Sequence, residues 1–179
     1  MMKLTQCSAF LLLCFTSVVS ANSLKVTMHE ATTSAEKGKN LGTVTITETP
    51  EGLLFTPALS GLTPGIHGFH IHDHPNCAPG QKAGKTVPAL QAGGHFDPNN
   101  KGSHRGPYDT KGHLGDLPGL VVNSDGTASY PVLAPRIQSL TEINHHALMI
   151  HVHGDNYSDH PEALGGGAAR FACGVIQSE

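Results

Sequence analysis

The sequence has little positive charge, little sign of helices and, beyond its first residues, no long apolar run. Its 179 residues include 11 Lys and Arg against 14 Asp and Glu, and this mildly acidic balance argues against nucleic acid and anionic membranes as partners. After residue 21, no apolar segment approaches the roughly 18 to 20 residues that a membrane-spanning helix needs. Only residues 137–143 hint at a helical turn, so helices contribute little to the expected fold.

Residues 1–21 have the features of a secretory signal peptide. Lys3 is their only charge, an apolar core follows, and Val19, Ser20 and Ala21 form a small-residue cleavage site. We therefore expect an exported, soluble domain of residues 22–179, with ten basic and 14 acidic residues and a net charge of −4 when histidines are neutral. Lipid attachment through Cys14 is the alternative, but Leu13 is not the small residue that such a signal requires.

Cys77 and Cys173 are the two cysteines left after the signal peptide is removed. A pair of cysteines in an oxidising compartment predicts a disulfide bond. The alternative is two buried free thiols.

Short alternating segments separated by turn residues predict an all-β domain. They are residues 24–28, 43–46, 53–55, 68–72, 120–122, 128–130, 147–152 and 170–176. Because no helices cover these strands, their apolar faces must cover each other, as in an immunoglobulin-like sandwich or a flattened, eight-stranded Greek-key barrel. Residues 73–94, 95–118 and 153–169 carry almost no strand signal, and a compact domain must tether such long segments.

The loop of residues 95–116 contains three histidines at nine-residue intervals and a closing carboxylate. These are His95, His104, His113 and Asp116. Three imidazoles and one carboxylate suit tetrahedral Zn²⁺ and leave no open position, which is typical of a structural site. The alternative is a solvated polar loop with incidental histidines.

A second candidate metal site begins with His70 and His72, which leave the same face of a predicted strand. His151 ends another predicted strand, and pairing of the strands would bring it beside them. One more imidazole from the long loop would complete a four-nitrogen set that favours Cu(II). If His95 used both ring nitrogens it would serve both metals, although spacing alone does not establish this bridge.

Four motifs of the chain resemble those of the copper/zinc superoxide dismutases, and the resemblance spans nearly all of the mature sequence. They lie at residues 68–72, 93–97, 112–116 and 164–176. Residues 154–159 and the signal peptide resemble the bacterial periplasmic branch, which includes monomers and homodimers.

The resemblance implies one copper and one zinc ion per subunit. The copper ligands would be His70, His72, His95 and His151, and the zinc ligands would be His95, His104, His113 and Asp116. Asp155 matches an aspartate that hydrogen-bonds to ligands of both metals, Cys77 and Cys173 match the family's disulfide, and Arg170 matches its active-site arginine.

The implied reaction converts two superoxide anions and two protons to O₂ and H₂O₂, with His95 also carrying a proton. His153 stands where the bacterial branch commonly has glycine. We expect it to have no role at copper; the alternatives are a spare ligand or a side chain that hydrogen-bonds to the ligands. His67 matches a structural position; His29, His74, His145, His146 and His160 match no ligand. An exported metal buffer, which would not need Arg170, and a catalytically silent binding domain, which would lack copper ligands, are the competing hypotheses.

Overall fold

The computed structural model describes residues 22–177, so the expected signal peptide, residues 1–21, lies outside the described residues. Within the described part of the chain, no helix is long and apolar enough to cross a membrane.

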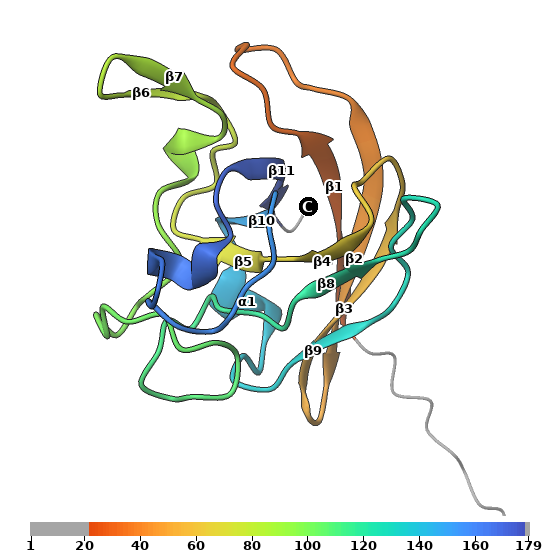
Figure 1. Ribbon diagram of the computed structural model, residues 1–179. Helices are drawn as coiled ribbons and strands as arrows, with labels where there is room; N and C mark the ends of the chain where they lie inside the picture. Colours follow the sequence, from red (N-terminus) through yellow and green to blue (C-terminus); the bar gives the residue numbers. More distant parts are fainter. Residues whose placement is uncertain (1–21, 178–179) are drawn as a thin grey trace, which may run out of the picture.

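A seven-stranded antiparallel sheet makes up most of the domain, with the strand order β5-β10-β11-β1-β2-β3-β9. Figure 1 shows this sheet curling into a half-barrel, with the separate pair β4-β8 running across it. The strands are β1 Ser23–Glu30, β2 Asn40–Thr49, β3 Gly52–Leu59, β4 Gly65–His67, β5 Phe69–His72, β6 Gly80–Lys82, β7 Lys85–Val87, β8 Leu120–Val122, β9 Val132–Ala134, β10 His146–His151 and β11 Arg170–Ile176. Three short helices lie between them: η1 Leu90–Ala92, α1 Leu140–Ile143 and η2 Ala163–Gly166.

The core lies inside the curl, where alternate residues of β1, β2 and β3 point inward. Val44, Ile46 and Phe55 are fully buried there, and Phe55 meets Phe69 edge to face with ring centroids 5.9 Å apart. Leu120 of β8 packs into the same apolar cluster. Strand β8 therefore helps to cover the open side of the half-barrel.

The predicted all-β fold is confirmed, and seven of the eight expected segments overlap strands. The exception is 128–130, where Ala128 makes only an isolated bridge to Leu59 and the strand, β9, begins at Val132. Pro131 lies between the two and lacks the N–H that a continuous ladder needs. Strands β4, β6 and β7 were not expected, because most of their residues are exposed and leave no alternating apolar pattern. The hint at 137–143 corresponds to α1, capped by Ser139 and Glu142.

Strands β5 and β10 position the candidate site, and they are buried on both faces. Phe69 and Ile71 of β5 enter the core, whereas His70 and His72 face the long loop. The loop is bonded directly to β5, since Phe96 N donates to Ile71 O and Ile71 N donates to Gly115 O. The loop thus covers the free edge of β5, which is the first strand of the sheet.

The expected disulfide between Cys77 and Cys173 is present, with Cα atoms 5.7 Å apart. Cys173 belongs to β11, and Cys77 belongs to the segment 73–94 that lacked strand signal. The bond therefore tethers that segment to the main sheet, as the sequence predicted.

Candidate metal centre

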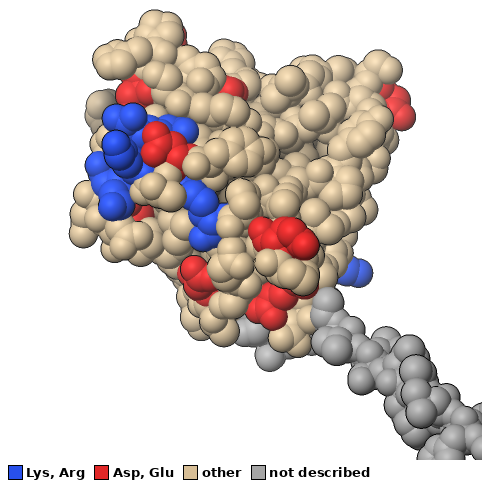
Figure 2. Space-filling view, turned by 90° about the horizontal axis from the view of Figure 1, so that it is seen from below, with Lys and Arg blue, Asp and Glu red and all other residues tan. Residues whose placement is uncertain are grey.

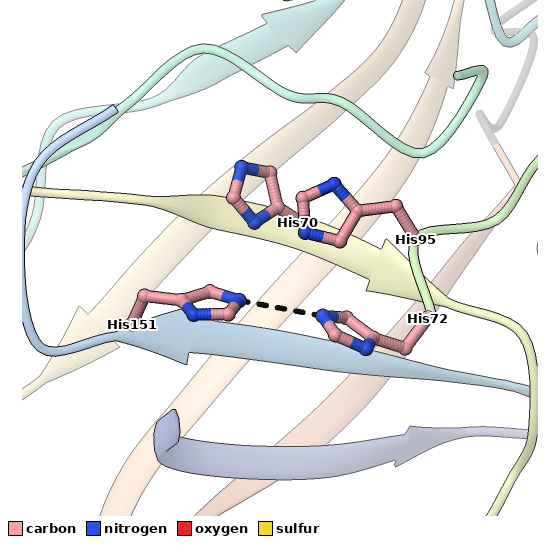
Figure 3. Close-up of side chains that lie close together, drawn as sticks. All are labelled: His70, His72, His95 and His151. Atoms are coloured by element: carbon pink, nitrogen blue, oxygen red, sulfur yellow. Dashed lines mark hydrogen bonds between the residues drawn. The ribbon is translucent and has the colours of Figure 1, made fainter. Parts of the chain in front are cut away.

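Four histidine rings gather on the outer face of β5 and β10 (Figure 3). His70 and His72 are two residues apart on β5, and antiparallel pairing with β10 brings His151 alongside them. His95 enters from the loop, and its backbone forms an isolated antiparallel β-bridge with that of His72. One ligand atom from each ring lies within 4.8 Å of the others, and all four residues are buried. The set expected to bind copper is therefore assembled.

Backbone carbonyls decide which nitrogen of His72 and of His151 carries the proton. His72 Nδ1 donates to Gly93 O at 3.0 Å, and His151 Nδ1 donates to Ala168 O at 3.3 Å. Each Nε2 then presents a lone pair, and these two atoms face each other at 3.3 Å. Two buried lone pairs so close together fit a cation bound between them.

The zinc side centres on the Asp116 carboxylate, and its imidazoles come from the loop. The Nδ1 atoms of His95, His104 and His113 lie 3.0, 3.1 and 3.4 Å from Asp116 Oδ1. Of these contacts, only that of His95 has hydrogen-bond geometry. Three nitrogens converging on one carboxylate oxygen form a donor set suited to a divalent cation.

His95 lies between the two groups. Its ring centroid is 4.0 Å from that of His70 on one side, and 5.2 and 5.5 Å from those of His104 and His113 on the other. Its Nδ1 faces Asp116, while its Nε2 is buried and unpaired. The arrangement therefore places one nitrogen on each side.

Asp155 joins the two groups from the active-site loop, residues 152–169. Its Oδ2 accepts from His70 Nε2 and its Oδ1 accepts from His104 Nε2, both at 2.7 Å. In the neutral rings, these bonds place the proton on Nε2 and leave each Nδ1 with a lone pair. Both Nδ1 atoms are buried and without a hydrogen-bond partner among the described residues.

Burial and charge prepare these side chains to bind cations. Burial lowers the pKa of His70 and His72 well below the usual value and that of His151 to about 4, so these rings are neutral ligands at pH 7. Burial also opposes a charge on His104, but contacts with Asp116 and Asp155 outweigh it and raise its pKa to about 9. Such a site calls for positive charge, which a divalent cation supplies.

A second group of possible ligands, whose ligand atoms also lie within 4.8 Å of one another, differs from the expected zinc set at one position. It contains His70, His95, His104 and Asp116, without His113. His70 has only Nδ1 to offer because its Nε2 bonds to Asp155, and it also belongs to the first group. The His113 Nδ1 is buried without a partner in the described chain. The donor chemistry thus fits His113 at zinc and His70 at copper.

Arg170, at the start of β11, lies beside the first group. Its Nη1 donates to Ala89 O and its Nη2 donates to Gly93 O. The Gly93 carbonyl also accepts from His72. The shared carbonyl places the guanidinium beside His72. After burial and neighbouring histidines, the positive charge of Arg170 also contributes to the lowered pKa values of His72 and His151.

The remaining histidines stay outside both groups within the described chain. His153 is exposed, as are His74 and His160. His67 is buried, but its two nitrogens contact the carbonyls of His151 and Thr63, both at 2.7 Å.

Three residues near the site were given no role from the sequence, although Tyr157 and Asp159 lie in the motif of residues 154–159. Asp159 accepts from His104 N and, within its own loop, from Leu164 N; the Tyr157 hydroxyl accepts from Gly119 N; and Arg136 donates to main-chain carbonyls of residues 106–113. The contacts with His104, Gly119 and residues 106–113 join segments far apart in the chain, so no local spacing reveals them.

A half-barrel that carries two adjoining buried groups of possible metal ligands is typical of a class of two-metal proteins. Residues 40–176 match the family model described as copper/zinc superoxide dismutase. A superoxide dismutase [Cu-Zn] 1 of Salmonella typhimurium is 62% identical over 161 residues, which cover 90% of each chain. The solved copper/zinc superoxide dismutase of Brucella abortus superposes with a TM-score of 0.84 at 56% identity, covering 87% of this chain and 100% of that one.

A solution structure of the monomeric enzyme from Salmonella enterica matches with a TM-score of 0.77 at 56% identity, over 86% of this chain and 99% of that one. The chain belongs to the copper/zinc superoxide dismutase family. It is an oxidoreductase that converts two superoxide anions and two protons to O₂ and H₂O₂, with copper and zinc as cofactors.

Proposed function

We propose that dismutation occurs on the histidine face of β5 and β10, with the ligands divided between two metals. Copper would be held by His70 through Nδ1 and by His72, His95 and His151 through Nε2, and zinc would be held by Asp116 and by His95, His104 and His113 through Nδ1. The observation that carries this division is the set of buried, unpaired nitrogens on His70, His95, His104 and His113. Unpaired buried donors are costly, and two cations account for all four.

Bound copper supplies one-electron redox chemistry that zinc cannot. Arg170 receives the substrate: two of its five N–H groups bond to carbonyls, which leaves three for an anion. Those carbonyl bonds fix the fork beside His72, so the anion is oriented as it arrives. His95 would carry one of the two protons on Nε2 when that nitrogen does not hold copper, while its Nδ1 would stay with the zinc group.

The mature enzyme acts in the periplasm after removal of residues 1–21. A disulfide favours an oxidising compartment, and the relatives compared with this chain are bacterial. Cell fractionation of bacteria expressing the full sequence tests this location. Activity confined to the cytoplasm, on a chain that still begins at Met1, would contradict it.

Metal content of single variants tests the division of ligands. His72→Ala should lose copper and keep zinc, His113→Ala should lose zinc and keep copper, and the exposed His153→Ala is the matched control that should keep both. Inductively coupled plasma mass spectrometry after reconstitution gives both contents. Stoichiometric zinc at unchanged affinity in His113→Ala would show that another residue, such as His70, completes that site.

A further inference from the structure

The zinc loop, residues 97–116, has neither helix nor strand, yet several of its main-chain groups are buried. Gly106, Pro107, Gly112 and His113 are all buried. A buried carbonyl needs a hydrogen-bond donor. Among the described residues, the carbonyls of Gly106, Pro107 and Gly112 accept no bond from within the loop, and that of His113 accepts only a long one, from Asp116 N at 3.5 Å. The loop therefore depends on donors from elsewhere in the molecule.

One side chain, Arg136, supplies these donors. Its Nε donates to Pro107 O at 2.8 Å, its Nη1 to Gly112 O at 3.3 Å, and its Nη2 to Gly106 O at 3.1 Å and to His113 O at 2.5 Å. Every hydrogen-bond partner of this side chain within residues 22–177 is a main-chain carbonyl of the loop. A planar fork with five donors can hold four carbonyls at once, which a single ammonium group cannot.

The backbone at Arg136 is itself attached to the barrel. Arg136 follows β9, in which Ala134 pairs with Leu53 of β3. The next residue, Ile137, is fully buried, and its carbonyl accepts from Leu53 N at 2.9 Å. Arg136 therefore projects from a firmly held edge of the main sheet into the loop.

The lysines and arginines of the zinc loop itself, unlike Arg136, lie on the surface. Lys101, Arg105 and Lys111 are exposed, and the Arg105 guanidinium makes only a 3.7 Å contact with Asp109. Figure 2 shows Lys and Arg side chains gathered at one side of the lower face, with acidic side chains among them. Arg136 is half-buried, so carbonyls of the loop replace water as the hydrogen-bond acceptors of its guanidinium.

We infer that Arg136 is a positioning residue of the zinc site. It touches neither metal nor substrate, and it acts by holding the carbonyl of His113 and the turn at Gly106 and Pro107 in register with β9. The inference rests on the proposed zinc set, because it places His113 among the ligands. Loss of groups that orient metal ligands typically lowers metal affinity by about 10- to 100-fold, and we expect a loss in that range for zinc.

The test compares zinc affinity, by competition with a chromophoric chelator, in Arg136→Ala and in Arg105→Ala, an arginine truncation on the exposed face of the same loop. Arg136→Ala should bind zinc about 10- to 100-fold more weakly, with copper affinity close to that of the unmodified protein. Arg105→Ala should bind both metals normally. Equal zinc affinities in the two variants would overturn the inference.

A spectroscopic measurement separates positioning from general destabilisation. Cobalt(II) placed in the zinc site reports its coordination through visible absorption, and this spectrum should change in Arg136→Ala. Arg136→Lys should behave like Arg136→Ala, because charge without the fork does not hold four carbonyls. Restoration of zinc affinity and cobalt spectrum by Lys would mean that charge alone matters, and would overturn the inference.

Two further variants complete the design. If Arg136→Ala does not fold, Arg136→Gln replaces it, because its amide retains two donors. Zinc affinity should also fall in Arg136→Gln, and an unchanged zinc affinity would overturn the inference. His113→Ala is the reference for the ligand set itself. If His113→Ala loses zinc while Arg136→Ala keeps it, only the role of Arg136 fails; if His113→Ala keeps zinc, the proposed ligand set fails.

Discussion

The copper side and the zinc side of the site are built in different ways. On the copper side, His70, His72 and His151 come from paired strands, and backbone carbonyls orient the rings of His72 and His151. On the zinc side the ligands come from a loop, and the carboxylates of Asp116 and Asp155 face the rings. The barrel thus largely preforms the copper side, whereas the zinc side depends on side chains that hold the loop closed.

His95 is where the two sides meet, so its removal should have the largest effect. His95→Ala removes a ligand from each metal and the group that carries a proton, and general acid–base groups typically contribute about 10²- to 10⁴-fold in rate. We expect a loss of activity in that range, together with a changed copper EPR spectrum and weaker zinc binding. His74→Ala, an exposed histidine outside both groups, is the control, and equal activities would show that the sides are not joined through His95.

Arg170 should separate substrate attraction from metal binding on the copper side. The mature chain carries a net charge of −4 and its substrate is an anion, so local positive charge must offset repulsion. Arg170→Glu should lower kcat/KM by about 10- to 100-fold, with metal content and Tm near those of the unmodified protein. Rates should fall with ionic strength in the unmodified enzyme, and this dependence should shrink or reverse in the variant. An unchanged rate and an unchanged salt dependence would show that Arg170 does not attract the substrate.

The disulfide should affect the copper side more than the zinc side. It closes a sequence separation of 96 residues, and the chain-entropy model then gives about 4 to 5 kcal/mol in the free energy of unfolding. Cys77→Ser should therefore lower Tm and increase hydrogen exchange in residues 73–94, with a smaller change in residues 97–116. Identical melting of the unmodified protein with and without reductant would contradict this expectation.

His153 should have the smallest effect, although it is only two residues from a copper ligand. Its side chain is exposed and belongs to neither group of ligands in the described chain. His153→Gly should leave copper affinity and activity unchanged. A shifted copper EPR spectrum would instead place this imidazole at the metal.

The copper side was the easier one to predict from the sequence. Alternation along a strand places His70 and His72 on one face, and the apolar pattern of 147–152 indicated the strand that carries His151. The loop ligands were visible as a regular spacing, but spacing does not show where a loop folds. The contacts of Arg136 with four loop carbonyls have no sequence signature, because main-chain acceptors look the same at every residue.

The strands of the fold likewise divide into those that could be predicted from the sequence and those that could not. Segments with several alternating apolar residues, such as 43–46 and 170–176, were predicted because burial on one face leaves a period of two. The hairpin β6-β7 was missed because its residues are mostly exposed. Its local pairing leaves no apolar pattern to detect.

The carbonyl of Gly93 accepts from both Arg170 and His72, so a single peptide group positions the proposed substrate-binding cation and a proposed copper ligand. Gly93 has φ +79° and ψ −159°, a conformation essentially restricted to glycine, and a Cβ there would meet the His74 ring at 3.0 Å. The distance between the Arg170 guanidinium and the His72 ring is therefore set by the peptide group of Gly93, and a residue with a side chain fits poorly at that position. A library that redesigns residues 73–94 to change substrate preference would need to hold this one position constant and vary the surrounding ones.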